Sequence, residues 1–207
     1  NRMTSFGTAL TASYTGDGLR AWKQNFSART YFLYDGILPI IEVNSSGTVT
    51  ATNTFGAHGL VSRREGNTSV FYSFDSEGNV AQRSDNQGAV LSNHLFSAHG
   101  SSLNGALSDP FGYKARFGYY TDNETGLQLL TRRYYDPSSG RFLTRDPLSY
   151  DGGINLYAYV GNNSTNYVDP LGEQGIPDPN NPPSDWKPLG PGVWRDRAGD
   201  TWHWHPD

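Results

Sequence analysis

The chain has 207 residues, a formal net charge of −4 and no cysteine. Acidic and basic residues are mixed without a lysine- or arginine-rich block, which argues against a surface that tracks nucleic-acid phosphates, and the lack of cysteine excludes disulfides and thiolate metal sites. Aromatic residues make up 14% of the chain and glycine contributes 24 residues, a composition that favours short strands joined by tight turns over a helical bundle.

The N-terminal part of the chain carries no targeting or membrane-spanning signal. Residues 1–4 lack the charged start and apolar stretch of a signal peptide. The longest apolar run, at 37–41, is interrupted by Pro39 and is too short to span a bilayer. We therefore expect a piece of a longer polypeptide, with any export signal upstream.

A repeat of about twenty residues organises the first half. An aromatic residue is followed four positions later by glycine in four places, and a shortened version lies at 34–36. The units at 14–18, 34–36, 55–59, 74–78 and 96–100 start 19 to 22 residues apart. Each unit reads as a β-hairpin, with strand, glycine turn and returning strand. A β-sandwich also has regular turns, but it does not require a constant aromatic-to-glycine spacing. The pattern predicts consecutive antiparallel hairpins that pair edge to edge in one sheet.

These repeats resemble those of YD-repeat proteins, also called Rhs proteins. The resemblance lies in N-R-M-T at 1–4, Y-D-G at 34–36 and F-D-S-E-G-N-V at 74–80. It implies that the hairpins wind as a spiralling sheet, which forms a shell around a cargo polypeptide. On this interpretation residues 1–116 are the last part of a shell wall.

The next segment, 117–172, is similar to the Rhs-associated core, which ends such a shell. The similarity rests on motifs that occur in order: E-T-G-L at 124–127, R-Y-Y-D-P-S-S-G-R-F at 133–142, D-P-L at 146–148, G-G-I-N-L-Y-A-Y-V-G-N-N at 152–163 and V-D-P-L-G at 168–172. The aromatic residues set among these glycine turns are expected to fill a plug at the end of the shell: Tyr134, Tyr135, Phe142, Tyr157 and Tyr159.

The resemblance also implies a catalytic pair. Asp146 and Asp169 would act as an aspartic-peptidase-like dyad, tuned by Arg145, and would cut the chain once between Gly172 and Glu173. Two carboxylates about 3 Å apart share one proton, so one can serve as base towards water and the other as acid. A substrate in the same chain needs only slow chemistry.

A structural interpretation of the same motifs stays open. Asp-Pro-x-Gly is a favourable β-turn sequence in which the aspartate caps its own backbone. This chain also has Ser149 where the family has glycine in the first motif, and Glu173 where leucine is usual beside the cut. Carboxylates more than about 8 Å apart would be two turn caps only.

The C-terminal part changes character. Residues 173–191 contain six prolines and predict an extended, flexible linker. Residues 192–207 would begin a variable cargo or effector region, with a hairpin at 194–205 that turns at 197–200. His203, His205 and Asp207 alternate as weak candidate metal ligands, although exposed tail histidines are the commoner case. No cofactor is predicted.

The function expected is a secreted or cell-surface bacterial scaffold. Its partners would be its own C-terminal effector, the upstream shell repeats and a secretion apparatus, with no nucleic acid. The alternative is a non-catalytic adhesin whose sheet binds a surface glycan or protein, using Trp22, Trp186 and Trp194 to stack on sugars. A conventional enzyme is least favoured, because 1–172 shows no nucleophile–base pair, phosphate loop or metal cluster.

Overall fold

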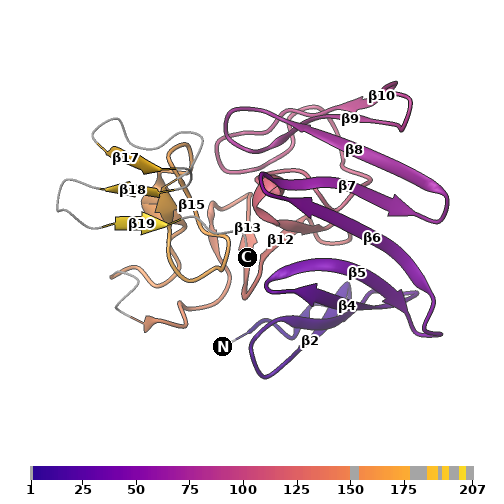
Figure 1. Cartoon of the computed structure of the whole chain (residues 1–207). Coiled ribbons are helices and arrows are strands. Elements are labelled where there is room, and N and C mark those ends of the chain that lie inside the picture. Colours follow the sequence, from indigo (N-terminus) through magenta and orange to yellow (C-terminus); the bar gives the residue numbers. More distant parts are fainter. Residues whose placement is uncertain (1, 150–153, 178–185, 191–192, 196–200, 204–207) are drawn as a thin grey trace.

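The fold is all-β, in a computed structural model that describes residues 2–149, 154–177, 186–190, 193–195 and 201–203. Ten strands form one antiparallel sheet in chain order, which curves through the indigo and magenta part of Figure 1. The predicted consecutive hairpins are confirmed. The strands are β1 (Ser5–Phe6), β2 (Leu10–Tyr14), β3 (Arg20–Gln24), β4 (Arg29–Asp35), β5 (Leu38–Asn44), β6 (Val49–Gly56), β7 (Gly59–Glu65), β8 (Thr68–Phe74), β9 (Val80–Ser84) and β10 (Val90–Asn93).

The aromatic residue of each of the first four repeats lies at a β-bulge. The register shifts immediately before Tyr14, Tyr34, Phe55 and Phe74, where each hairpin leaves its regular pairing. A bulge adds a residue to one strand and increases the twist. The constant spacing in the sequence therefore has a local cause, because bulge and glycine turn recur together. The fifth unit, at Phe96, retains only an isolated bridge to Ser102.

The repeat glycines give room to a later segment of the chain. Gly59, Gly78 and Gly100 have φ values of 96°, 79° and 89°, in the left-handed region that favours glycine. A Cβ at Gly59 would lie 2.1 Å from the Arg116 carbonyl oxygen, and one at Gly78 would lie 2.6 Å from the Phe117 ring. The hairpin turns therefore form a row of close contacts for the 3-10 turn η1 (Ala115–Phe117).

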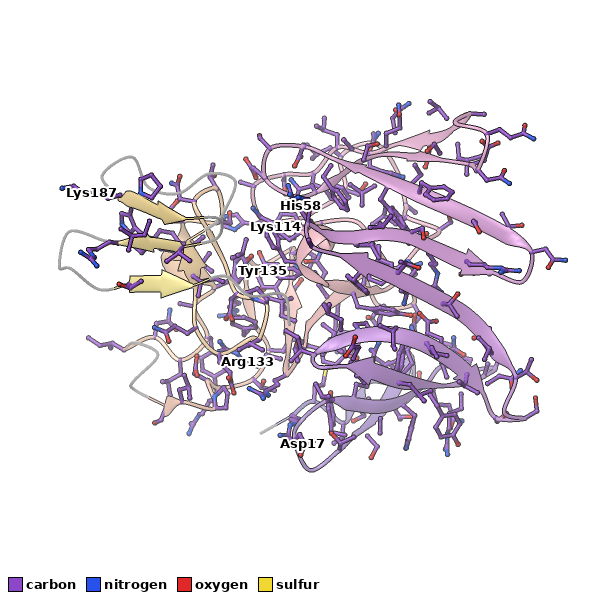
Figure 2. All side chains as sticks on the ribbon, viewed as in Figure 1. Asp17, His58, Lys114, Arg133, Tyr135 and Lys187 are labelled. Carbon is purple, nitrogen blue, oxygen red and sulfur yellow. The ribbon has the colours of Figure 1, made fainter. Side chains whose placement is uncertain are left out.

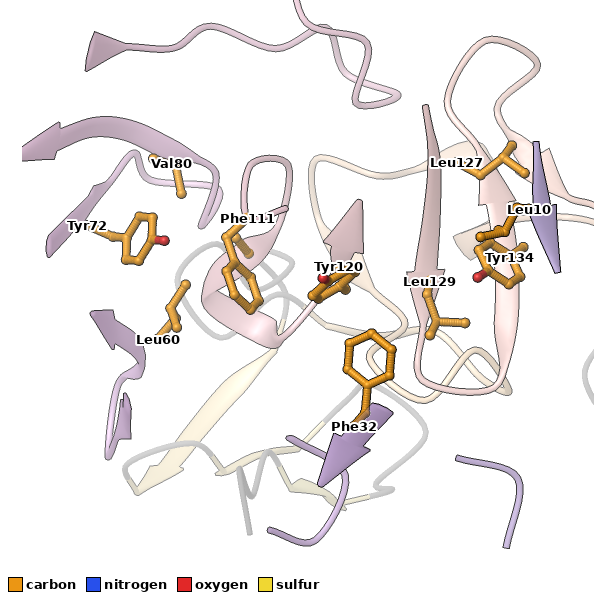
Figure 3. Close-up of a cluster of buried hydrophobic side chains, with 11 residues drawn as sticks. Leu10, Phe32, Leu60, Tyr72, Val80, Phe111, Tyr120, Leu127, Leu129 and Tyr134 are labelled. Carbon is orange, nitrogen blue, oxygen red and sulfur yellow. The ribbon is translucent and has the colours of Figure 1, made fainter. Parts of the chain in front are cut away.

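A second sheet packs against the first. It contains β11 (Tyr120–Asp122), β12 (Leu127–Leu130), β13 (Arg133–Asp136) and β14 (Arg141–Phe142), paired in chain order. Figure 3 shows Phe111 and Tyr120 between residues of the large sheet and β12, in edge-to-face contact at 5.6 Å. The shared core is apolar and contains Leu10, Phe32, Leu60, Tyr72, Val80, Phe111, Ala115, Tyr120, Leu127, Leu129 and Tyr134.

A buried ionic cluster also joins the two sheets. Arg20 and Lys23 of β3 contact the Asp122 carboxylate at 2.6 and 2.8 Å, and the Tyr134 hydroxyl donates to it at 2.5 Å. Burial opposes ionisation of Asp122, but the two cations outweigh it and hold the pKa of this carboxyl below its usual value. The first hairpins are thus tied to the core segment by charge as well as by apolar packing.

Four of the five predicted plug aromatics are buried. Tyr134, Tyr135, Phe142 and Tyr159 are at most 1% exposed, whereas the prediction for Tyr157 is wrong because this ring is 37% exposed. The Tyr157 amide donates to the Asn155 side chain, and the resulting turn carries the Tyr157 ring to the surface while Tyr159 faces inward. Motif membership alone did not distinguish the two tyrosines.

The segment predicted as a linker contains short strands. β15 (Tyr167–Val168) pairs with β16 (Ile176–Pro177), so the chain after the second Asp-Pro motif returns to the core. β17 (Lys187–Gly190), β18 (Val193–Arg195) and β19 (Thr201–His203) form a separate small sheet, in yellow in Figure 1. The β18–β19 pairing confirms the predicted C-terminal hairpin. The segment predicted as a linker is not entirely an extended spacer, because parts of it belong to β16 and β17. The domain boundaries themselves stay predictions.

Candidate functional site

The two aspartates of the Asp-Pro motifs meet at one buried arginine. Nη2 of Arg133 lies 2.9 Å from Oδ2 of Asp146 and 3.2 Å from Oδ2 of Asp169. The two carboxylate oxygens are therefore separated by less than the sum of these distances, inside the limit set above for unrelated turn caps. The contact that joins the two carboxylates is the Arg133 guanidinium. Figure 2 shows Arg133 among the core loops beside the large sheet.

Both aspartates also cap turns, as the structural interpretation predicted. Oδ1 of Asp146 accepts the Leu148 amide at 2.8 Å. Oδ1 of Asp169 accepts the amides of Glu173 and Gln174 at 2.9 and 3.2 Å. In each residue one oxygen serves the turn and the other faces Arg133. The two interpretations of the motif are therefore compatible in this fold.

Two buried tyrosines, Tyr119 and the plug residue Tyr159, position Asp169. Its backbone amide donates to the Tyr119 hydroxyl at 2.7 Å, and this hydroxyl lies 2.9 Å from that of Tyr159. Both tyrosines are almost fully buried. The aspartate is consequently fixed by a packed aromatic cluster, and its place does not depend on a loose loop.

The peptide bond predicted to be cut lies inside this site. Nε of Arg133 donates to the Gly172 carbonyl oxygen, while the Glu173 amide on the other side of the bond donates to Asp169. Gly172 has a φ of 66°, and a Cβ there would lie 2.5 Å from the Leu130 carbonyl oxygen. Glycine is required at this position both for conformation and for space.

Burial perturbs the ionisation of the site. It raises the pKa of Asp169 to about 6, against the opposing effects of Arg133 and of the two backbone amides. Burial also lowers the pKa of Arg133, although both carboxylates favour its charged form. A carboxyl that titrates near neutral pH can exchange a proton during a reaction.

Water can reach the site through a cavity of about 430 Å³. It is lined by four residues already described and by residues on either side of the second Asp-Pro motif: Arg133, Asp146, Asp169 and Glu173, with Ile154, Asn155, Ala158, Val160, Gly161, Tyr167, Gln174 and Gly175. Both aspartates and Glu173, the residue after the predicted scissile bond, therefore border a space for solvent.

Arg133 is the site residue that the sequence-based prediction missed. The prediction named Arg145, whose side chain is exposed and whose Nε donates to the Tyr157 hydroxyl at 3.4 Å. The tuning role of Arg145 stays a prediction. Arg133 belongs to the R-Y-Y-D motif, but no spacing rule links it to the Asp-Pro motifs, since its contacts depend on β13 packing beside both loops.

The other candidate sites gain no support. No group of three or more His, Cys, Asp or Glu side chains in the described part of the chain is arranged to hold a metal ion. His205 and Asp207 lie outside the described residues, and only the backbone of His203 is described. Of the candidate sugar-stacking rings, Trp22 is covered by the Arg29 guanidinium at 4.1 Å and Trp186 contacts Tyr167.

The sequence is similar to parts of much longer bacterial proteins. It is 34% identical over 171 residues to the tRNA3(Ser)-specific nuclease WapA of Bacillus spizizenii, a match that covers 78% of this chain and 7% of that protein. It is 47% identical over 55 residues to the toxin protein Tse5 of Pseudomonas aeruginosa, which covers 27% of this chain and 4% of Tse5. No family model matches.

Solved structures show the same fold. The Photorhabdus luminescens Tc holotoxin pore aligns over 81% of this chain and 9% of its own, with a TM-score of 0.61 and 23% identity. A TcdB2–TccC3 crystal structure aligns over 79% of this chain and 9% of its own, with a TM-score of 0.60 and 23% identity. The chain resembles an Rhs-type toxin region. It spans only a small part of each of these relatives.

Proposed function

We propose that the chain is the end of a secreted toxin scaffold that encloses a C-terminal effector and frees it by cutting itself between Gly172 and Glu173. The toxin names of its relatives support the setting. One observation carries the cleavage: both sides of this peptide bond are hydrogen-bonded within a buried site that holds two aspartates. No helix in the described part of the chain has the length and apolar character of a membrane crossing.

The geometry suggests a different role for each aspartate. Asp146 lines the cavity with its Oδ1 and Oδ2 oriented by a backbone amide and by Arg133, so it serves as the base that takes a proton from water. The water oxygen then attacks the Gly172 carbonyl carbon. Asp169 contacts the Glu173 nitrogen and has a pKa raised to about 6, so it serves as the acid.

The proposed steps balance. A C–O bond forms at Gly172 and the C–N bond to Glu173 breaks as Asp169 gives its proton to the departing nitrogen. The products are a carboxyl group at Gly172 and an amine at Glu173, and transfer of the carboxyl proton to the amine gives a carboxylate and an ammonium group. Asp146 then holds the proton taken from water, and passage of this proton through solvent to Asp169 restores the starting state. Because the substrate is already bound in the same chain, a single slow turnover is sufficient.

The test uses the longer natural chain, with its effector, and intact-mass analysis. We expect two fragments from the wild type and only intact protein from Asp146→Asn and Asp169→Asn. Asp136→Asn is the matched control, because Asp136 caps an Asp-Pro turn through Ser138 without contributing to the cavity. Cleavage that persists in both site variants would remove the proposed mechanism. An intact wild type that binds a glycan array would favour the adhesin alternative.

The remaining partners belong to the same proposal. The effector would follow residue 172 inside a shell formed by this sheet and upstream repeats, and an export apparatus would deliver the assembly. The open edge of β1, which pairs only with β2 among the described strands, is the place where an upstream hairpin would continue the sheet.

A further inference from the structure

Arg133 is the most highly connected residue of the site. Its side chain is 2% exposed. Nε donates to the Gly172 carbonyl, Nη1 to the Leu156 carbonyl at 3.5 Å, and Nη2 contacts both aspartates. The guanidinium also lies over the Phe142 ring at 3.6 Å from its centroid. Each polar edge of the group therefore has an assigned partner, and one of these partners is the carbonyl that would be attacked.

A cation fixed at that oxygen has a chemical consequence. Attack by water on a peptide carbonyl moves negative charge onto the carbonyl oxygen, and donors already oriented towards it stabilise this charge without reorganisation. The effect is strong in a buried site because the local dielectric constant is low. Removal of one such donor in other hydrolases slows the reaction by about 100- to 1,000-fold.

We propose that Arg133 is a catalytic residue of self-cleavage, whose Nε stabilises the negative charge that develops on the Gly172 oxygen while its Nη2 holds Asp146 and Asp169 beside the bond. This inference rests on the proposed function. The inference adds Arg133 to the aspartate pair as a third catalytic group. It also explains why one guanidinium contacts both buried carboxylates. No bond to Arg133 forms or breaks, and its proton stays on the guanidinium throughout.

The shape of the guanidinium matters as well as its charge. Arginine presents several donors in one rigid plane, whereas lysine is a compact point charge on a flexible stem. A lysine at 133 could neutralise one carboxylate but could not also reach the Gly172 oxygen and the other carboxylate. Arg133→Lys should therefore retain much of the charge balance and lose the contact with the reacting carbonyl.

The neighbouring Arg132 provides a matched control. Its side chain is 29% exposed and pairs with the Glu173 carboxylate at 2.5 Å, so it contacts the residue after the bond but not the bond itself. Arg132→Lys removes the same chemical group one position away. A general effect of arginine substitution in β13 or the turn before it would appear in both variants.

The experiment follows cleavage over time in the full chain, effector included, after a pulse of cell-free synthesis. We expect Arg133→Lys to cut about 100-fold more slowly than wild type or worse, and Arg132→Lys to cut within about fivefold of wild type. Near-UV circular dichroism checks folding through the buried tyrosines. Added guanidinium ion should accelerate Arg133→Ala, and an equal concentration of ammonium should not.

The outcomes separate the two proposals. A wild type that stays intact removes the proposed function and the role of Arg133 with it. A wild type that cuts, beside a folded Arg133→Lys variant that cuts equally fast, removes only the role of Arg133.

A second measurement leaves Arg133 in place and decides the question if its variants do not fold. In the Asp146→Asn chain, with Gly172 labelled at its carbonyl carbon, NMR should detect a coupling across the hydrogen bond from the Arg133 Nε nitrogen. A rapidly exchanging Nε–H without this coupling would overturn the inference.

Discussion

The ionisation of Asp169 makes the stability of the fold depend on pH in an unusual direction. Most paired carboxylates have lowered pKa values and stabilise the folded chain as pH rises. For Asp169, burial raises the pKa from 3.8 to about 6. Between these two values the folded chain binds more protons at this site than the unfolded chain does. The contribution of Asp169 is therefore fully present below about pH 4 and is lost as pH rises through about 6.

The size of the effect follows from the shift. Each pKa unit corresponds to about 1.4 kcal/mol, so Asp169 should reduce the free energy of unfolding by about 3 kcal/mol between about pH 3 and pH 7. Asp169 is 2% exposed, so solvent screening removes little of this value. Asp122 and Asp136 have lowered pKa values, so their contributions to stability change with pH in the opposite direction. Comparing two chains that both retain Asp122 and Asp136 removes these contributions.

The assay is urea unfolding across this pH range in two chains that cannot cut themselves. One carries Asp146→Asn and the other carries Asp146→Asn with Asp169→Asn. Asp146 is the last of the main influences on Asp169, so its removal changes the expected shift little. The difference in free energy of unfolding between the two chains should change by about 3 kcal/mol, with the Asp169 chain losing stability as pH rises. Parallel curves, or a change of opposite sign, would refute this reasoning.

Two further predictions concern the row of glycine turns and the residue after the predicted cut. Gly59→Ala should lower the free energy of unfolding by about 2 kcal/mol more than Gly66→Ala does. Both glycines have a positive φ, but only a Cβ at position 59 would meet backbone atoms within contact distance. Equal losses for the two variants in chemical denaturation would contradict the packing described. Glu173→Arg should slow self-cleavage about fivefold through repulsion from Arg132, and Arg132→Glu in the same chain should restore the rate, since their partly exposed ion pair is worth about 1 kcal/mol. A double variant as slow as the single one in the time course would show that the pair does not matter.

The repeat sheet was predictable because its cause is local. Each of the first four aromatic-to-glycine units contains both the residue that follows a bulge and the glycine that turns the hairpin, as at Phe55 and Gly59. Neither feature needs information from elsewhere in the chain. The sequence did not show that Gly59 packs against Arg116 and Gly78 against Phe117. These partners lie about 60 and 40 residues apart in the chain, so no local pattern links them.

The site was predictable only in part. Asp146 and Asp169 stand in recognisable turns. Asp169 contacts the predicted bond directly, and Asp146 is joined to it through Arg133. Arg133 is missed because its position beside them depends on how strand β13 packs against two separate loops. Tyr157 shows the same limit, since a motif tyrosine faces solvent or core according to one local turn. Tertiary contacts, which no short motif encodes, decide both cases.

The most direct test is the N-terminal residue of the fragment released from the full-length wild-type protein. Intact-mass analysis together with N-terminal sequencing identifies it without any substitution. The account predicts a fragment that begins at Glu173, with its partner ending at Gly172. A cut at any other bond, or a chain that remains whole when folded near pH 6, would contradict the assignment of this buried peptide bond as the substrate.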